Sequence, residues 1–285
     1  MRDVPFALAR ALDDASIAVP LVFPLSSVPE CLDLVALRWR DALVTFFAID
    51  PRGTPSNKQM EAIGTGFFME CGDGVALVTA DHVIEPHLDG TAGGIALMVK
   101  GCAVPLTKKF LRLPDVDLCA CKFDLAELAA HGLKKIKPIP LLTDRSGQES
   151  LGMFAAMGFP NTWNVRNRRR NQGPDSLTIF CSSAGAEPRR ARAPFQREFA
   201  LDFDRKRCTP GIPNARHAGV PELQGLSGGP VFEIHVDIGR TRDDLIQVGA
   251  EFAGIVLRRE PRKSQIICAA RESLFPLLMA VALHL

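Results

Sequence analysis

The sequence predicts an all-β protein made of two consecutive antiparallel β-barrels, with a helical segment at each end. From Leu37 onward, short apolar runs rich in Val, Ile, Phe and Thr are separated by Gly, Pro and Asp, which is typical of strands and turns. Only one internal stretch, 124–135, is convincingly helical, so strands and helices do not alternate as they do in α/β proteins. A chain of 285 residues can bury a sizeable core in two units that share an interface.

The first barrel is expected to span residues 37–140, after an N-terminal helical extension over residues 1–36. The extension carries Ala, Leu and Arg at helical spacing before a proline-rich break. Acidic residues in its first turns, and the lack of an apolar core before a cleavage site, argue against a secretory signal. Strands of the first barrel are expected in four runs: 42–50, 64–71, 75–83 and 94–100.

The second barrel is expected to span residues 141–285 and to end in a helix from about Glu272 to Leu285. The helix at 124–135 lies where a connection between two β units would fall. A short strand is expected at 139–142, and five longer runs follow it: 153–159, 176–183, 197–204, 229–236 and 245–257.

The composition is that of an ordinary globular protein and gives no sign of a cofactor. A formal net charge of +2 favours neither nucleic acid nor a membrane surface as partner, and no run of about eighteen apolar residues could cross a bilayer. Without an export signal, the eight cysteines are expected to be reduced thiols in a cytoplasmic protein. No Cys/His spacing suits zinc, so we expect no metal site.

One stretch points to nucleophilic chemistry: residues 224–230, Gln-Gly-Leu-Ser-Gly-Gly-Pro. Glycines on both sides of Ser227 let the backbone take angles that a Cβ forbids, and they let another chain approach the hydroxyl closely. This suits a nucleophile whose neighbouring N–H groups point at a developing oxyanion. By itself, the G-x-S-x-G pattern is equally compatible with a glycine-rich turn that carries a solvated serine.

Two further stretches supply a base and an acid. His82 ends the run Leu-Val-Thr-Ala-Asp-His, directly after a predicted strand. Asp117 precedes the apolar run Leu-Cys-Ala-Cys, which is expected to be a buried strand. Taken alone, such a histidine is more often a surface or core residue than a general base, and such an aspartate can simply cap a turn.

Together, the three blocks resemble those of the trypsin-like, chymotrypsin-fold serine peptidases, closest in style to the bacterial HtrA-like branch. Residues 79–82 are similar to the family's Thr-Ala-x-His block, 117–119 to its aspartate block, and 225–230 to its Gly-x-Ser-Gly-Gly-Pro block. The order His, Asp, Ser is also the family's, and the resemblance covers roughly residues 37–270.

The resemblance implies one role for each residue. Ser227 Oγ attacks a peptide carbonyl, His82 takes its proton and later delivers it to the leaving amine, and Asp117 fixes the imidazole tautomer. The backbone N–H groups of Gly225 and Ser227 would form the oxyanion hole. Asp115 is an alternative acid, but we prefer Asp117 because the apolar strand follows it directly.

The chain departs from the family at two places. Leu226 stands where the digestive members carry an Asp that pairs with a freshly cut N-terminus, so we expect no activation by zymogen cleavage. HtrA-like proteins usually carry a PDZ domain after the second barrel, and we expect none here. The order of the blocks also argues against an α/β-hydrolase elbow, because only His235 and His284 follow the serine.

The resemblance also indicates where substrate would bind. Pro221 would lie near the floor of the primary specificity pocket beside Glu222, and Leu257 and Arg258 would continue the strand that pairs with substrate. Because no acid stands at the floor position, we expect a small or apolar residue at the cleavage position. Residues 161–210 hold eleven Lys/Arg against five Asp/Glu, and we expect a solvated insertion there rather than a nucleic-acid site.

The leading hypothesis is a serine endopeptidase that acts on a protein or peptide substrate through an acyl-enzyme, without a cofactor. Two alternatives use the same residues. One is a protease-fold binding or regulatory module that only a partner protein activates, and the other is an esterase or acyltransferase. The sequence does not separate the three.

Overall fold

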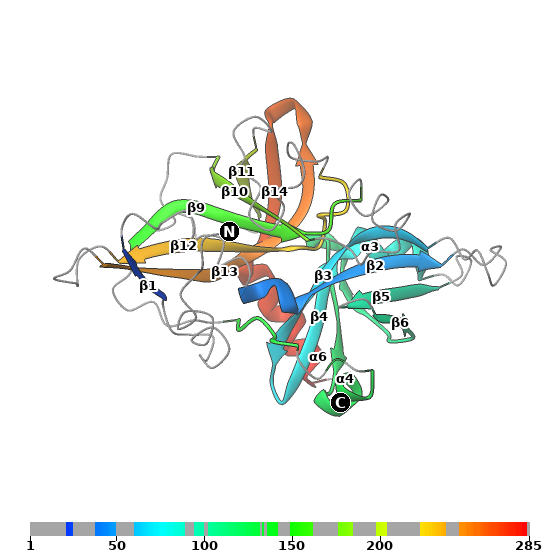
Figure 1. Ribbon diagram of the computed structural model, residues 1–285. Coiled ribbons are helices and arrows are strands. Elements are labelled where there is room, and N and C mark those ends of the chain that lie inside the picture. The colour runs from blue at the N-terminus through cyan, green and yellow to red at the C-terminus, as the bar shows by residue number, and fades with distance from the viewer. Residues whose placement is uncertain are drawn as a thin grey trace.

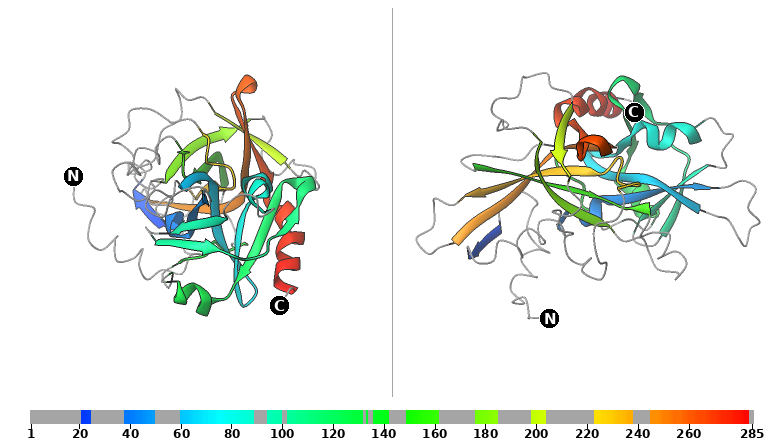
Figure 2. Two further views of the ribbon diagram at one scale, coloured as in Figure 1. Left: turned by 90° about the vertical axis from the view of Figure 1, so that its right-hand side faces the viewer. Right: turned by 90° about the horizontal axis from the view of Figure 1, so that it is seen from above.

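The computed structural model describes residues 21–24, 38–49, 60–88, 94–99, 102–131, 133, 136–141, 149–161, 176–184, 198–203, 223–237 and 245–283. Within these residues the protein is mostly β and consists of two seven-stranded antiparallel sheets with a C-terminal helix (Figures 1 and 2). The all-β prediction is confirmed.

The first sheet has the strand order β6-β5-β2-β3-β4-β8-β7. Its strands are β2 (Leu43–Ile49), β3 (Met60–Cys71), β4 (Gly74–Ala80), β5 (Ile95–Val99), β6 (Cys102–Leu106), β7 (Leu111–Leu113) and β8 (Leu118–Phe123). β2, β4 and β8 are buried along nearly their whole length, on both faces. That burial explains why these strands read as continuous apolar runs in the sequence.

This first sheet is a half-barrel and not the closed barrel predicted for residues 37–140. Among the described strands, no pairing joins β6 to β7, the two edges of the sheet. Both edges offer little for closure: β7 has three residues, and Pro105 removes a backbone donor from β6.

The second sheet contains a closed six-stranded barrel of order β13-β12-β9-β10-β11-β14, which the β13–β14 pairing closes. Its strands are β9 (Glu149–Gly158), β10 (Leu177–Ser183), β11 (Glu198–Asp202), β12 (Pro230–Asp237), β13 (Leu245–Glu260) and β14 (Gln265–Ala270). The barrel predicted for this half is therefore confirmed, including the β-strand that directly follows the Ser227 motif.

The predicted N-terminal helical extension is wrong at residues 21–24, which form strand β1 (Leu21–Pro24) along the edge of β13. All other residues of that extension lie outside the described part of the chain. The strand predicted at 139–142 is also wrong over its described residues, 139–141. Ile139 makes only an isolated bridge to Met69, because prolines flank it and remove the neighbouring backbone donors.

Both predicted helices are present but shorter than expected. Helix α4 (Leu125–Ala130) begins where the Asp124 carboxylate accepts the backbone N–H of Glu127. At the other end of the chain, a 3₁₀ turn (Arg271–Leu274) leads into helix α6 (Phe275–Leu283).

One apolar core joins the two sheets. Trp39 stacks on Phe232 with ring centroids 5.1 Å apart, and Phe67 meets Phe252 at 5.6 Å. Each pair takes one ring from either side of the interface, so the two sheets are packed as one body. The core thus fixes the relative position of residues from both halves.

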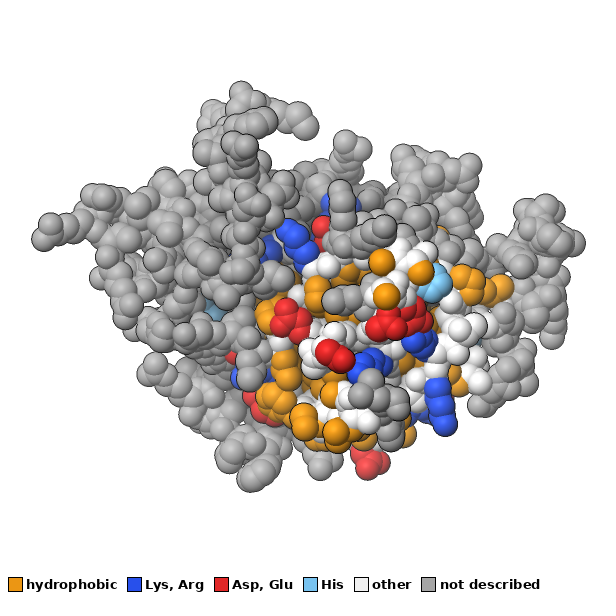
Figure 3. Space-filling model, turned by 90° about the horizontal axis from the view of Figure 1, so that it is seen from below, with side chains coloured by type: hydrophobic (Ala, Val, Ile, Leu, Met, Phe, Trp, Pro, Cys, Tyr) orange, Lys and Arg blue, Asp and Glu red, His pale blue; other side chains and the backbone are white. Residues whose placement is uncertain are grey.

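Helix α6 follows the last barrel strand but packs against β3, β7 and β8 of the first sheet (Figure 1). Its outer face leaves Met279 and Leu283 exposed. Seen from below, apolar side chains lie among charged ones on the described surface (Figure 3). None of the helices in the described ranges is long and apolar enough to cross a membrane.

Candidate active site

His82 is presented by a short helix at the end of a buried strand. β4 ends at Ala80, and α3 (Asp81–Ile84) begins immediately after it. Asp81 and Val83, on either side of His82, are buried, whereas the His82 side chain is 46% exposed. Helical spacing thus places His82 on the outer face of α3.

An ion pair fixes α3 from the neighbouring strand. The guanidinium of Arg112, on β7, donates from Nε and Nη2 to the two carboxylate oxygens of the buried Asp81, at 2.6 and 2.7 Å. Arg112 Nη2 also lies 3.0 Å from Glu85 Oε1. The hydrogen bonds to Asp81 and Glu85 raise the pKa of Arg112, so its charge is permanent.

Asp117 lies at a turn that points its carboxylate at His82. A 3₁₀ turn (Pro114–Val116) precedes it, and Asp117 itself has a left-handed backbone with φ of 55°. Its Oδ1 accepts the backbone N–H of His82 at 3.0 Å, and its Oδ2 lies 2.7 Å from His82 Nδ1. The neighbouring Asp115 is exposed. The structure therefore brings His82 and Asp117 together.

The pKa of Asp117 lies below its ordinary value. Burial works in the opposite direction, but the hydrogen bonds from the side chain and backbone of His82 outweigh it. The charges of His82 and Arg258 lower the pKa further. Asp117 is consequently a carboxylate at neutral pH, the form that holds an imidazole by accepting its N–H.

The Ser227 motif folds into two consecutive β-turns that share Leu226. The N–H of Leu226 donates to the Leu223 carbonyl and the N–H of Gly229 to the Leu226 carbonyl, both at 2.9 Å. The third residues of the turns are Gly225 and Gly228, with φ of 97° and 84°. A type II turn requires such a positive φ at its third position, which explains both glycines.

These turns pack directly on the strands that lead to His82. The N–H of Thr65, on β3, donates to the Ser227 carbonyl at 2.9 Å, and a Cβ on Gly228 would overlap Thr65 and Thr79. β4, which carries Thr79, ends two residues before His82. The contact between sheets thus places the Ser227 main chain beside the end of β4.

The two predicted oxyanion donors differ from their neighbours in the serine turn. The backbone N–H groups of Gly225 and Ser227 make no backbone hydrogen bond to any described residue, whereas the N–H groups of Leu226, Gly228 and Gly229 are all engaged. Ser227 itself is half-buried.

The predicted substrate-binding residues differ in their burial and in their contacts. Leu257 is fully buried at a β-bulge and has no exposed surface to offer a substrate. Arg258 is exposed, but both its terminal nitrogens are paired with the carboxylate of Glu198, at 3.1 and 3.2 Å. Pro221 and Glu222 lie outside the described residues, as does most of the basic stretch 161–210.

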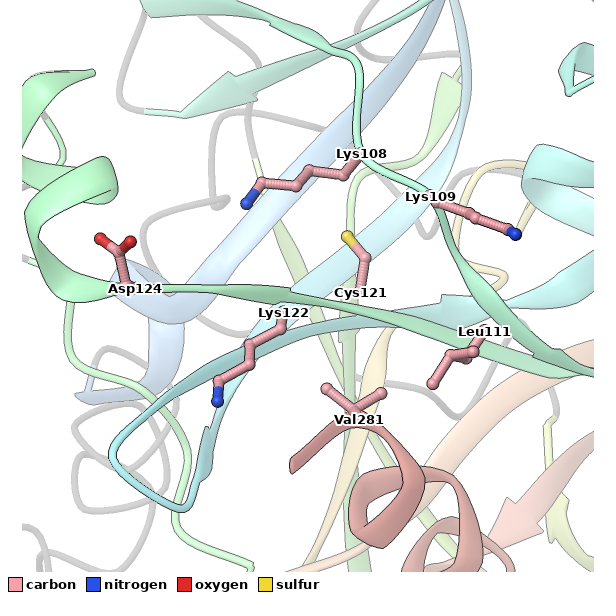
Figure 4. A pocket seen from close by; sticks show the side chains of 7 residues that line it. All are labelled: Lys108, Lys109, Leu111, Cys121, Lys122, Asp124 and Val281. Atoms are coloured by element: carbon pink, nitrogen blue, oxygen red, sulfur yellow. The ribbon is translucent and has the colours of Figure 1, made fainter. Parts of the chain in front are cut away.

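A hollow of about 500 Å³ lies elsewhere on the first sheet and α6, lined by Lys108, Lys109, Leu111, Cys121, Lys122, Asp124 and Val281 (Figure 4). Its lysine side chains do not converge, and two of them are paired: Lys108 with Glu127 at 2.5 Å and Lys122 with Asp73 at 3.3 Å. None of the predicted site residues lines it.

Cys119 and Cys121 do not compete with Ser227 as nucleophiles. Burial raises the pKa of Cys119 and Cys121, which keeps both as thiols at neutral pH. Cys119 lies behind the end of β4, with Sγ 3.8 Å from the carbonyls of Thr79 and Ala80. Both residues act as small apolar side chains, and neither forms a disulfide.

Sequence reasoning missed two residues that hold this site, Thr65 and Arg112. The only sequence signal for Thr65 is its position between two glycines, in Gly64-Thr65-Gly66. Nothing in the sequence pairs Arg112 with Asp81, because the partners are 31 residues apart and meet only through sheet pairing.

Comparison with known proteins finds structural similarity at low sequence identity. No protein-family model matches the chain, and no curated protein matches it. The crystal structure of the active form of the Rv3671c protease from M. tuberculosis is similar with a TM-score of 0.48 and 13% identity, over 94% of this chain and 92% of that one. Its inactive form gives a TM-score of 0.45 and 13% identity, over 92% and 99%.

A structure from work on the coupled folding and binding of the Sesbania mosaic virus VPg protein is similar with a TM-score of 0.44 and 14% identity. That similarity covers 82% of this chain and 87% of the other.

Proposed function

We propose that this protein is a serine endopeptidase of the trypsin-like, HtrA-like kind, with His82, Asp117 and Ser227 as its catalytic residues. The observation that carries the proposal is the 2.7 Å hydrogen bond between His82 Nδ1 and Asp117 Oδ2, beside the strands on which the Ser227 main chain packs. An imidazole held at Nδ1 by a carboxylate keeps Nε2 as the acceptor, which is the form that a general base needs.

In the proposed reaction, Ser227 Oγ bonds to the carbonyl carbon of a peptide while its proton passes to His82 Nε2. The carbonyl electron pair moves to the oxygen, where the N–H groups of Gly225 and Ser227 would bind it. Losing one such donor costs about 2.7–4 kcal/mol in the transition state. The C–N bond then breaks as His82 gives its proton to the amine, and water repeats the sequence on the acyl-enzyme.

Labelling with a fluorophosphonate probe tests this proposal. The wild type should be labelled, Ser227→Ala should not, and Ser182→Ala, which removes an exposed hydroxyl on β10, should be labelled like the wild type. A peptide library and matched esters then separate an endopeptidase from an esterase or acyltransferase. Labelling that appears only after addition of cell lysate would indicate the partner-activated module. No Ser227-dependent labelling under either condition would contradict the proposed enzymatic function.

A further inference from the structure

Every polar atom of Thr65 makes a hydrogen bond, and its N–H and hydroxyl make theirs across the contact between the two sheets. It is fully buried in β3. Its N–H donates to the Ser227 carbonyl at 2.9 Å, and its hydroxyl donates to the Gly225 carbonyl at 2.6 Å. The same hydroxyl accepts the Phe159 N–H at 2.9 Å, and the Thr65 carbonyl accepts the hydroxyl of Thr79 at 2.7 Å.

Thr65 completes a set of carbonyl contacts that runs through the whole serine turn. Five consecutive carbonyls, from residue 223 to residue 227, each accept a hydrogen bond. The donors are, in order, the N–H of Leu226, the N–H of Asn161, the hydroxyl of Thr65, the N–H of Gly229 and the N–H of Thr65. The orientation of every peptide unit in the turn is thereby fixed.

The direction of the Ser227 N–H follows from this set. In a trans peptide the N–H points opposite to the carbonyl of the same unit. The Leu226 carbonyl is turned inward toward Gly229, so the Ser227 N–H is turned away from it. The peptide units on either side, whose carbonyls belong to Gly225 and Ser227, are the two that Thr65 holds.

We propose that Thr65 is a positioning residue, whose hydroxyl and N–H clamp the serine turn so that the Ser227 and Gly225 N–H groups stay aimed at the oxyanion. This inference rests on the proposed function. The packing around Thr65 is tight, because a Cβ on Gly158 would lie 2.8 Å from Thr65 Oγ1 and 3.2 Å from Leu226 Cα. Without the hydroxyl, the Gly225 carbonyl and the Phe159 N–H would both be buried without this partner.

The chain provides a matched control for the loss of this hydroxyl. Thr45 lies directly opposite Thr65 on β2 and is also fully buried, but its hydroxyl has no hydrogen-bond partner among the described residues. Thr65→Val and Thr45→Val therefore make the same chemical change at paired positions of one sheet, and only the first removes the contacts to the serine turn.

Steady-state kinetics is the first measurement. Thr65→Val should lower kcat about 10²-fold, with little change in KM, because a slight displacement of groups at a reacting centre typically has an effect of this size. Its affinity for a peptide aldehyde, which forms a tetrahedral adduct, should fall in parallel. Thr45→Val should match the wild type, and Thr65→Ser, which keeps the hydroxyl, should restore kcat. An unchanged kcat in Thr65→Val, or equal losses in Thr65→Ser and Thr65→Val, would overturn the proposal.

Amide hydrogen exchange tests the clamp without reference to catalysis. Exchange of residues 223–229 should be faster in Thr65→Val and unchanged in Thr45→Val, and equal exchange in all proteins would refute the clamp. If wild-type Ser227 proves unreactive, the proposed function fails while this result still stands. Should Thr65→Val not fold, Thr65→Ser decides: wild-type kcat and exchange support the clamp, and loss of both contradicts it.

Discussion

The first sheet holds His82 and Asp117 with charged groups of its own, whereas Ser227 is held by neutral hydrogen bonds that come from elsewhere. Asp81 and Arg112 form a bidentate pair beside His82, and Asp117 binds His82 twice. The partners in these contacts are 35 and 31 residues apart in sequence. By contrast, Thr65 meets Gly225 across 160 residues.

This difference separates two requirements for the proposed activity. The His82–Asp117 pair depends on the pairing of β4, β7 and β8 within one sheet. The serine turn depends on how the two sheets dock, because Thr65 from β3 holds the carbonyls of Gly225 and Ser227. Substitutions that affect only one requirement can therefore tell the two apart.

The largest effect is expected at the His82–Asp117 pair. Asp117→Asn should lower kcat about 10⁴-fold, because an amide in place of the carboxylate favours the wrong imidazole tautomer. The fold should persist, since Asn tolerates the left-handed backbone at this position. Steady-state kinetics and thermal unfolding measure the two outcomes. The matched variant Asp115→Asn should behave as wild type, and a larger loss there would reverse the assignment of the acid.

The next largest effect is on stability, at the ion pair behind His82. Arg112→Met leaves the carboxylate of Asp81 buried without its partner and should lower the free energy of unfolding by about 3–5 kcal/mol. Arg258→Met removes a pair with Glu198 whose side chains are 50% and 46% exposed, and should cost about 0–1 kcal/mol. Urea denaturation compares the variants. Equal losses of unfolding free energy in Arg112→Met and Arg258→Met would mean that the burial of Asp81 does not determine the cost of removing its partner.

A smaller effect should separate strain from crowding at the serine turn. Gly72 also has a positive φ, 60°, but open space where a Cβ would lie, so Gly72→Ala should cost only the backbone penalty of about 1–2 kcal/mol. Gly228→Ala should cost more, because its Cβ would also overlap Thr65 and Thr79. It should also reduce fluorophosphonate labelling of Ser227. Equal unfolding midpoints for Gly72→Ala and Gly228→Ala would show that the contact between the sheets shifts to accommodate the extra Cβ.

The smallest effect concerns acid. Because the folded pKa of Asp117 is lowered, its contribution to stability is fully present above the unfolded value, about 3.9, and is lost as pH falls through the folded pKa. Unfolding free energy measured from pH 6 downward should therefore fall more steeply below about pH 4 in the wild type than in Asp117→Asn. Parallel curves would indicate that His82 does not hold the carboxylate in its ionised form.

The sequence was informative where structure is local. Apolar runs predicted most strands of both sheets but not β6, β7 or β14. Glycines at 225 and 228 predicted unusual backbone angles, because such angles depend on neighbours in the chain. The three blocks also predicted that His82 and Asp117 would meet. Pairing over long distances left no periodic signal, so the open first sheet, strand β1 and the role of Thr65 could not be read from the residues.

The position of helix α6 determines when the first sheet is covered during synthesis. Chains emerge from the ribosome at about 5–20 residues per second, and domains generally fold as they emerge. Here β8, whose first residue follows Asp117, is covered by a helix that ends at residue 283. The nascent first half therefore keeps an uncovered apolar surface until the second half is made. The apolar face of β8 beside Asp117 would therefore be covered only after residues 275–283 had left the ribosome.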